Sequence, residues 1–563
     1  MLDLLLTPTD GGTAWRHQLA PGQARAGWEC VGPRGLARRL GRVLGHPAEP
    51  ASMPDRLSAI ASRLEQHDDG TRSYSESRHT DPYGVAAYLL ALRDRLRLAA
   101  WRGTALTGSA RLADLSALEA LATPSLQPGL PDVLHALAAA VVQAGPLPVP
   151  VTIRLAAPRE GFAPIVLRLV EALASAGANV CDPVPDAACA PADTDLGRLQ
   201  RSLLDPALPR APLAGDGSFL LLEADTPVEA AELAASALRD RPLPSATLVV
   251  AGEGGALDAA LFRQGLPTLG LSESSRFRPH LQALPLRLAL AFRPRDPFRA
   301  AELLLLPGAP LPSQARRKLL DALNEMPGIG SPAWREAVEE AIAQAVERAR
   351  EGGAKEPAAQ KAGQDLAGRI EDWFSGEDFD PQEGITGAKA AGLCAMVAHW
   401  AGARSGGADE DENALEAGLW AHAAAVARTL QRILAARPPG ERLSQLALAQ
   451  LHDLAVGDGS GVADFDGEAG RPALCSAPGA VLAGVATTLW FGFVQDVGGS
   501  PAPEPWTSAE QSALAAAGVH LPAPGATRRF EAWGWRRPLL AARERAVLVR
   551  WRLAGANPVA PHA

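Results

Sequence analysis

Apolar runs and helical patterns alternate in the first part of the chain. The run LDLLL at residues 2–6 precedes a Gly-rich turn and a second short apolar run, WECV, at residues 28–31. Residues 52–143 then carry apolar side chains at helical spacing, and β-type runs return after residue 145, as expected when a helical block interrupts a sheet. This pattern predicts a first α/β unit over residues 1–212, with a helical insertion at about residues 52–143.

The same alternation begins again with FLLLE at residues 219–223 and continues as strand–helix–strand–helix. Such alternation favours a parallel sheet with right-handed crossovers. Near the end of the chain, β-type runs reappear before a predicted helix at residues 539–545 and a last strand at residues 546–552. The predicted fold class is therefore α/β, with two parallel-sheet domains that are each interrupted by a large helical insertion. The second domain starts at residues 213–310, is interrupted at residues 311–465 and is completed by residues 466–563.

Composition excludes several classes of protein. The chain has 563 residues, 47% of them hydrophobic, and a formal net charge of -9, which fits about three or four folded domains. Its 5 cysteines are spread widely without a CxxC pair, which argues against a disulfide scaffold, a zinc ribbon and a cysteine-ligated cluster. The start lacks the basic residues of a signal peptide, and glycine and proline interrupt the longest uncharged stretch, residues 477–494. We expect a cytoplasmic protein with no membrane partner.

The four lysines make nucleotide motifs easy to check, because a P-loop needs Gly-Lys after its glycines. None of the lysines follows a glycine; they are Lys318, Lys355, Lys361 and Lys389. The segment TPTDGGTA stands after the first predicted strand, where a phosphate loop would stand. Its degenerate phosphate-loop positions are Asp10, Gly11, Gly12 and Thr13. Since the cation is missing and Asp10 would repel phosphate, we predict no Walker-type ATP hydrolysis and no cofactor.

Motifs for metal-dependent and nucleophilic catalysis are also missing. No Asp or Glu stands two residues before any lysine, so the (D/E)-x-K motif of restriction-type nucleases is absent. The sequence contains neither HExxH nor GxSxG. Asp464 and Asp466 fit a turn better than a calcium loop. We predict no catalytic residue, no bound metal and no nuclease activity of the chain by itself.

Basic and aromatic residues gather near the end of the sequence. Residues 528–552 hold eight Arg and two Glu, with Trp residues between them. Guanidinium groups contact phosphates and indole rings stack on bases, so this segment predicts DNA contact. The candidate residues are Arg528, Arg529, Trp533, Trp535, Arg536 and Arg537. The alternative is that both tryptophans pack on the last strand and leave the arginines as a solvated rim. A smaller basic helix adds the candidates Arg34, Arg38 and Arg39.

The order of several segments resembles a known family. The run LLEADTPVEAAELAASALRD, followed by ATLVVAG and LDAALFRQGLPTLG, is similar to the opening of the second motor domain in superfamily-one helicases of the UvrD/RecB/AddB group. The run LQALPLRLALAFRPRDPFRAAELLLLP resembles the AddB-type continuation. GRPALCSAPGAVLAGVATTLWFGFV and RPLLAARERAVLVRW resemble the late strands of that domain. The resemblance covers about residues 215–310 and 470–552, and the first half of the chain matches only in outline.

This resemblance implies two RecA-like domains. Because the phosphate-loop lysine is missing, it implies an inactivated helicase core like the RecC and AddB subunits, which hold DNA while a partner supplies the motor. The expected function is a non-catalytic DNA-binding scaffold of a helicase–nuclease assembly in DNA-end processing, repair or anti-phage defence. The expected partners are a DNA single strand or duplex end and a helicase or nuclease subunit. Two alternatives stay open: an ATP-dependent helicase with an atypical nucleotide site, and a protein-interaction hub that binds no nucleic acid.

Overall fold

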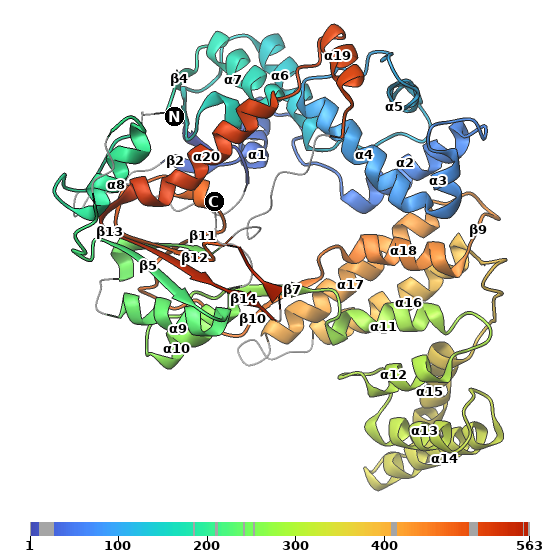
Figure 1. The fold of residues 1–563 in the computed structure, drawn as a ribbon. Helices are drawn as coiled ribbons and strands as arrows, with labels where there is room; N and C mark the ends of the chain where they lie inside the picture. The colour runs from blue at the N-terminus through green and yellow to red at the C-terminus, as the bar shows by residue number, and fades with distance from the viewer. Residues whose placement is uncertain are drawn as a thin grey trace.

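Two parallel β-sheets and many helices form the protein (Figure 1). The computed structural model describes residues 2–10, 27–183, 186–208, 212–239, 243–250, 254–406, 414–494, 505–555 and 557–560. Every neighbouring pair of strands within the two larger sheets is parallel. The predicted α/β class with parallel sheets is therefore confirmed.

The first sheet has the strand order β2-β1-β3-β4. Its strands are β1 (Leu2–Leu6), β2 (Trp28–Val31), β3 (Val151–Leu155) and β4 (Asn179–Cys181). Side chains alternate along β3, where Val151, Ile153 and Leu155 are buried, as a strand with one face on a core requires. That core lies against three helices, which are α1 (Pro33–Leu44), α6 (Leu130–Ala144) and α7 (Pro164–Ser175).

A helical block interrupts this sheet between β2 and β3. It contains α2 (Met53–His67), α3 (Ser75–Thr80), α4 (Pro82–Leu98) and α5 (Ala110–Ala120). Apolar residues at helical spacing give these helices a core of their own, in which Leu57, Leu90 and Trp101 are buried. Helix α6 lies at the end of the predicted insertion, yet it packs on the first sheet: its Leu134 and Leu137 share a core with Leu4 of β1.

The second sheet has the order β11-β6-β12-β13-β5. Its strands are β5 (Phe219–Ala224), β6 (Ala246–Val250), β11 (Ala473–Cys475), β12 (Val485–Phe491) and β13 (Ala542–Trp551). Helices α9 (Pro227–Leu238) and α10 (Gly255–Arg263) pack on the apolar side chains of one face, including Leu248 and Val549. The late strands β12 and β13 lie between β5 and β6. Strands from the C-terminal part of the chain thus complete this sheet.

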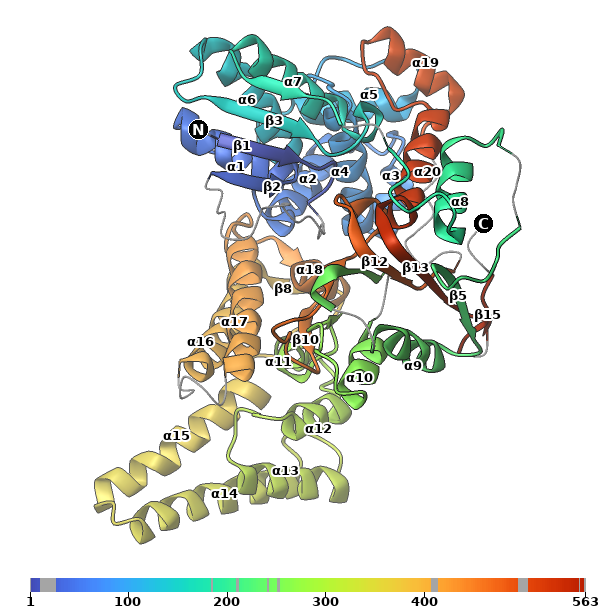
Figure 2. The ribbon, with the colours of Figure 1, turned by 90° about the vertical axis from the view of Figure 1, so that its left-hand side faces the viewer.

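A second helical block lies between α10 and β11, and one large core holds it together. Its helices are α11 (Pro279–Ala289), α12 (Pro297–Leu305), α13 (Ser313–Glu325), α14 (Pro332–Glu351), α15 (Glu356–Phe374), α16 (Gly387–Ser405), α17 (Ala414–Ala435) and α18 (Gln445–Val456). Two small antiparallel pairs accompany them, β7 (Ser272–Ser275) with β10 (Ser460–Ala463) and β8 (Ile385–Thr386) with β9 (Arg442–Leu443). Figure 2 shows α12–α15 extending away from both sheets.

The last helices differ from the predicted ones. Helix α19 (Ser508–Ala516) is followed by a long helix α20 (Pro524–Ala541), and β13 begins directly at Ala542. The predicted helix at residues 539–545 is therefore wrong. Pro524 suits the first turn of a helix, and Gly534 lets α20 lie close to Gly479, since a Cβ at Gly534 would come within 3.4 Å of the Gly479 Cα atom.

Short elements complete the fold. They are α8 (Asp195–Leu204), the 3₁₀ turns η1 (Arg159–Gly161), η2 (Leu243–Ser245) and η3 (Pro478–Ala480), and the strands β14 (Leu553–Ala554) and β15 (Asn557–Pro558). Among the helices in the described ranges, none combines the length and the apolar character that a bilayer crossing needs.

Candidate functional site

Helix α20 contributes side chains to the cores of both α/β units. Near its middle, Trp533 is 9% exposed and packs into the core of the first sheet. The Phe530 and Trp533 rings stack with their centroids 5.4 Å apart. Phe530 also lies over Gly161 of η1, where an added Cβ would come within 2.2 Å of the ring. The first half of α20 is thus anchored on the first unit.

The end of α20 is anchored on the second unit. Ala541 packs with Val249 of β6 and Trp490 of β12. The Thr488 Oγ1 hydroxyl donates a hydrogen bond to the carbonyl oxygen of Pro538 at 2.9 Å. Figure 1 shows the helix running from the first sheet to the second. One rigid element therefore joins the two parallel-sheet units.

The outer face of α20 carries part of the predicted DNA-binding set. Arg528, Arg529 and Ala532 are exposed, and Trp535 is 43% exposed. Spacings of four and three residues place Arg528, Ala532 and Trp535 along one helix face. Within the described parts of the chain, Arg528 and Arg529 form no hydrogen bond or ion pair. These two guanidinium groups are available to an external anion.

The rest of the predicted set is held inside the protein. Arg537 pairs with Asp186 at 2.5 Å, donates to the carbonyl oxygen of Val481 at 3.0 Å and lies 5.5 Å from the centre of the Trp533 ring. Arg536 is half-buried and donates to the carbonyl oxygen of Leu203 at 3.2 Å. The structure thus separates Trp533, Arg536 and Arg537 from the outward residues of α20.

A cavity of about 590 Å³ lies between α20 and the first sheet. Leu5 of β1, Leu155 of β3 and Cys181 of β4 line it from the sheet, and Trp533 and Arg537 line it from α20. Strand β1 pairs with β2 on one side and β3 on the other. Leu5, Leu155 and Cys181 stand at or next to the last residues of their strands. The cavity therefore lies at the carboxyl ends of parallel strands, where open α/β sheets commonly bind ligands.

Every charged side chain that lines this cavity has an oppositely charged partner. Arg154 lies 3.3 Å from Asp3, Asp182 lies 2.8 Å from Arg159, and Arg537 lies 2.5 Å from Asp186. The lining contributes two arginines and two aspartates, so its formal charges cancel. A triphosphate would find no uncompensated cation in this part of the described structure.

Of the degenerate phosphate-loop positions, Asp10 is described, and Gly11, Gly12 and Thr13 lie outside the described residues. The Asp10 carboxylate accepts a hydrogen bond from the Arg34 backbone N–H at 3.1 Å. A Cβ at Gly32 would come within 2.3 Å of Asp10 Oδ1, so only glycine fits there. The N-terminus of α1, which would favour an anion, is thus occupied by an internal carboxylate.

The predicted basic helix corresponds to α1, and internal carboxylates neutralise most of it. Arg38 forms two hydrogen bonds of 2.8 Å with Glu49, and Arg39 pairs with Glu29 at 2.5 Å. The hydrogen bonds from Arg38 hold the pKa of Glu49 below its usual range. Arg34 is exposed, while its backbone N–H contacts Asp10. This helix offers a phosphate fewer available charges than its sequence indicates.

An ion pair between α5 and α19 was missed by sequence reasoning. Glu510 of α19 is 3% exposed and accepts hydrogen bonds from Arg111 and from Ser109, the latter at 2.7 Å. Although burial opposes ionisation, these donors and the Thr507 backbone N–H lower the pKa of Glu510 to about 2. The Thr507–Glu510 spacing of a capping box could have revealed the helix start, but no local pattern identifies Arg111 as its partner.

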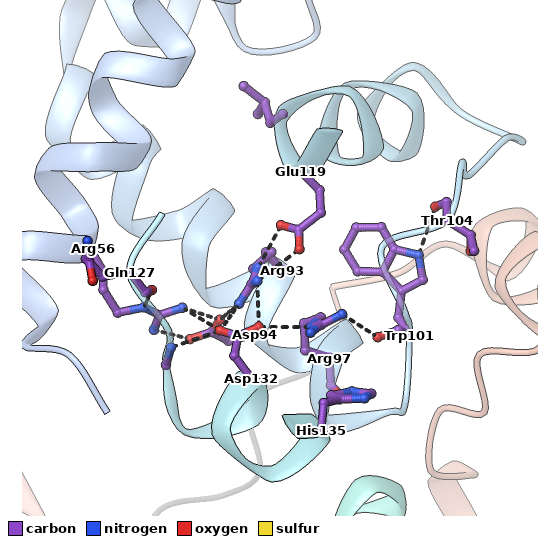
Figure 3. A network of polar contacts seen from close by, with 12 residues as sticks. Arg56, Arg93, Asp94, Arg97, Trp101, Thr104, Glu119, Gln127, Asp132 and His135 are labelled. Carbon is purple, nitrogen blue, oxygen red and sulfur yellow. Dashed lines mark hydrogen bonds and ion pairs between the residues drawn. The ribbon is translucent and has the colours of Figure 1, made fainter. Parts of the chain in front are cut away.

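A buried ion network joins four helices of the first unit (Figure 3). Its members are Arg56, Arg93, Asp94, Arg97, Glu119 and Asp132. Arg93 of α4 donates to Glu119 of α5 at 3.0 Å and to Asp132 of α6 at 2.6 Å. Three arginines face three carboxylates, so the charges balance. The network fastens the helical insertion to the helix that covers the first sheet.

Comparison with known proteins adds no relative. The sequence matches no protein-family model, and no curated protein matches it. Within the described ranges, no group of three or more His, Cys, Asp or Glu side chains is arranged to hold a metal ion.

Proposed function

We propose that this chain is a non-catalytic DNA-binding scaffold, an inactivated superfamily-one helicase core within a helicase–nuclease assembly that processes DNA ends. The two parallel sheets, each with an inserted helical block, are compatible with two RecA-like domains. The helicase–nuclease assembly and the helicase or nuclease partner are inferred from the family resemblance. The proposal covers repair and anti-phage defence alike, since both process DNA ends.

The observation that carries this proposal is the double anchoring of α20. A helicase motor must move its two nucleotide-binding units relative to each other. Here Trp533 is buried in the first unit, and Ala541 of the same helix is buried in the second. Moving the units apart would expose one of these cores. Together with the balanced charges of the cavity, this favours a static frame over an ATP-driven motor.

The outer face of the same helix supports DNA binding. Arg528 and Arg529 offer two uncompensated charges, and Trp535 offers an indole ring nearby on the helix. Each arginine–phosphate contact adds about 0.7 to the salt slope of single-strand binding. Stacking of one base on Trp535 adds about 1–3 kcal/mol. The arrangement fits a single strand that lies along α20.

The test measures binding of a fluorescent oligothymidylate at several salt concentrations. Changing both Arg528→Glu and Arg529→Glu is expected to weaken binding and flatten its salt dependence. The matched control changes Arg317→Glu and Arg335→Glu, two exposed arginines on α13 and α14. If the α20 variant is folded and binds as the parent does, this DNA site is wrong. If the parent binds no DNA, the interaction-hub alternative replaces the proposal.

A further inference from the structure

A second cavity, of about 610 Å³, lies between α6 and α7 on the first unit. The end of α4 and the turn that follows it add Arg97 and Arg102 to its wall, and α7 adds Arg168. Its volume falls within the range of about 300–1,000 Å³ that small-molecule sites occupy. It shares no lining residue with the cavity beside α20.

The charges around this cavity do not balance. Its lining contains no Asp or Glu. Arg97 donates to Asp132 at 3.0 Å, whereas Arg102 and Arg168 form no hydrogen bond or ion pair with any residue that the structure describes. The nearby arginines of the buried network are all paired. Two uncompensated guanidinium groups therefore line one cavity.

A tight turn places Arg102 at the cavity. Ala100 has a left-handed backbone with φ of 68°, and helix α4 ends in a Schellman motif there. The Ala100 N–H donates to the carbonyl oxygen of Arg97, and the Trp101 N–H donates to that of Leu96. The next side chain, Trp101, is 1% exposed and donates its Nε1–H to Thr104 at 3.0 Å. With Trp101 held inside, Arg102 is exposed at the rim.

His135 lies in the same wall as an uncharged ring. Figure 3 shows the ring beside Arg97, and its Nε2 lies 2.9 Å from the Arg97 carbonyl oxygen. Since a carbonyl only accepts, Nε2 carries the proton. Burial, helped by the charges of Arg97 and Arg168 and opposed by the hydrogen bond to the Arg97 carbonyl oxygen and by Asp132, lowers the pKa of His135 to about 4. The ring is neutral at pH 7 and would respond to an anion bound beside it.

Apolar side chains of α6 form another part of the wall. Ala138 and Ala139 line the cavity, and Val142 lines it while 71% exposed to solvent. An exposed valine beside two uncompensated arginines suits a ligand with one anionic end and one flat or apolar part. A nucleoside phosphate has this combination.

We propose that this cavity binds a nucleoside phosphomonoester, with the phosphate between Arg102 and Arg168 and the nucleoside against α6. A phosphomonoester carries about -1.5 to -2 charges at pH 7, which matches two guanidinium groups. Arginine forks also match phosphate geometry. The ligand is a free nucleotide or the 5′-phosphorylated end of a DNA strand, which present the same group. The site uses no residue of α20 and extends beyond the proposed function.

Calorimetry with three probes tests this site. The probes are thymidine 5′-monophosphate, a 5′-phosphorylated oligothymidylate and the same oligonucleotide with a 5′-hydroxyl. The oligonucleotides are compared in the Arg528→Glu, Arg529→Glu background, so that contacts to α20 do not mask the difference. We expect the phosphorylated probes to bind more tightly than the hydroxyl probe. Changing Arg102→Gln and Arg168→Gln should weaken that binding about tenfold or more per lost contact.

The control is Arg95→Gln, an exposed arginine on α4 outside the cavity lining. NMR adds a second readout, because a phosphate beside His135 should raise the pKa of its ring. Binding of the phosphorylated oligonucleotide alone identifies a strand end as the ligand, and binding of the monophosphate alone identifies a free nucleotide. The proposal is overturned if neither phosphorylated probe binds, if the double variant binds both unchanged, or if the His135 resonances do not respond.

Discussion

Arg111 and Glu510 form an ion pair across 399 positions of the sequence, with Arg111 Nη2 2.5 Å from Glu510 Oε2. Arg111 belongs to the helical insertion of the first unit and Glu510 to α19, near the C-terminal end. The Arg111 guanidinium also lies 5.2 Å from the centre of the Trp506 ring. Helix α19 thus fastens the late part of the chain to the first unit.

Removing the charge of Glu510 should destabilise the protein. Glu510→Gln leaves the Arg111 guanidinium without its carboxylate, and we expect a loss of about 2–3 kcal/mol at pH 7. Because folding lowers the pKa of this carboxyl from 4.5 to about 2, its contribution is present above pH 4.5 and disappears as the pH falls toward 2. Urea unfolding of both proteins at a series of pH values checks this.

The difference between parent and variant should therefore shrink in acid. Glu544→Gln is the control, since Glu544 is exposed on β13 and its loss should change stability by less than about 0.5 kcal/mol. If the unfolding free energies of parent and Glu510→Gln differed by the same amount throughout the acidic range, folding would not lower the pKa of Glu510.

Replacing the two tryptophans of α20 should have different effects. Trp533→Ala removes a ring that is 9% exposed and should cost about 3–5 kcal/mol of stability. Trp535→Ala removes a ring that is 43% exposed, so it should cost much less stability and weaken single-strand binding. Thermal unfolding and DNA binding of both variants check this. Equal losses of stability would show that both rings serve the core.

The left-handed residue after α4 offers a stabilising change. An L-residue in this conformation costs about 1–2 kcal/mol, and glycine avoids this cost but gives the unfolded chain more freedom. Ala100→Gly should therefore raise the unfolding free energy by about 0.5–1 kcal/mol. Ala99→Gly is the control, because Ala99 has φ of -76° and glycine should lower stability there. The urea unfolding midpoints of both variants, compared with that of the parent, test this prediction.

The buried network should depend strongly on Arg93. Arg93→Met leaves Glu119 and Asp132 with fewer partners, and loss of one member of a buried network costs about 3–5 kcal/mol. Arg95→Met, on the exposed side of the same helix, should stay within about 0.5 kcal/mol of the parent. Chemical denaturation measures both. A small effect of Arg93→Met would mean that water replaces the lost contacts.

The purified chain should neither bind ATP tightly nor cleave DNA. The described cavity at the carboxyl edge of the first sheet has balanced charges, and the sequence has no Gly-Lys pair or (D/E)-x-K motif. Calorimetry with Mg-ATP and a nuclease assay with several divalent metals check these expectations. Turnover that disappears on changing Thr13 would instead support a helicase with an atypical nucleotide site.

Sequence patterns identified the sheets better than the site. The apolar run ATLVV located β6, because a strand that is buried on both faces needs consecutive apolar positions, and all five residues of β6 are buried. Helix α20 was harder to predict, since Gly525, Gly534 and Pro538 interrupt its helical pattern. Tertiary contacts override that local preference: Gly534 packs against Gly479, and the Pro538 carbonyl oxygen accepts a bond from Thr488.

Only part of the predicted DNA-binding set is exposed, because composition does not show which way a side chain points. Arg528 and Arg537 are equivalent in a count of charges, yet Arg528 is exposed while Arg537 pairs with Asp186. The same holds for Arg38, whose partner Glu49 lies eleven positions away in sequence. Arg102 and Arg168 are isolated arginines that belong to no sequence motif. Only the packing of α6 against α7 brings them to one cavity.

The position of β12 and β13 between β5 and β6 affects how the protein is made. During synthesis, β5 and β6 emerge long before β12 and β13, the strands that separate them. Until then each has an unpaired edge, which is a template for aggregation. The intervening helical block has mainly local contacts and can fold in that interval, whereas closing the sheet brings together residues as distant as Phe219 and Ala546. The second sheet should therefore form last, and fragments that stop before β13 should need a chaperone to stay in solution.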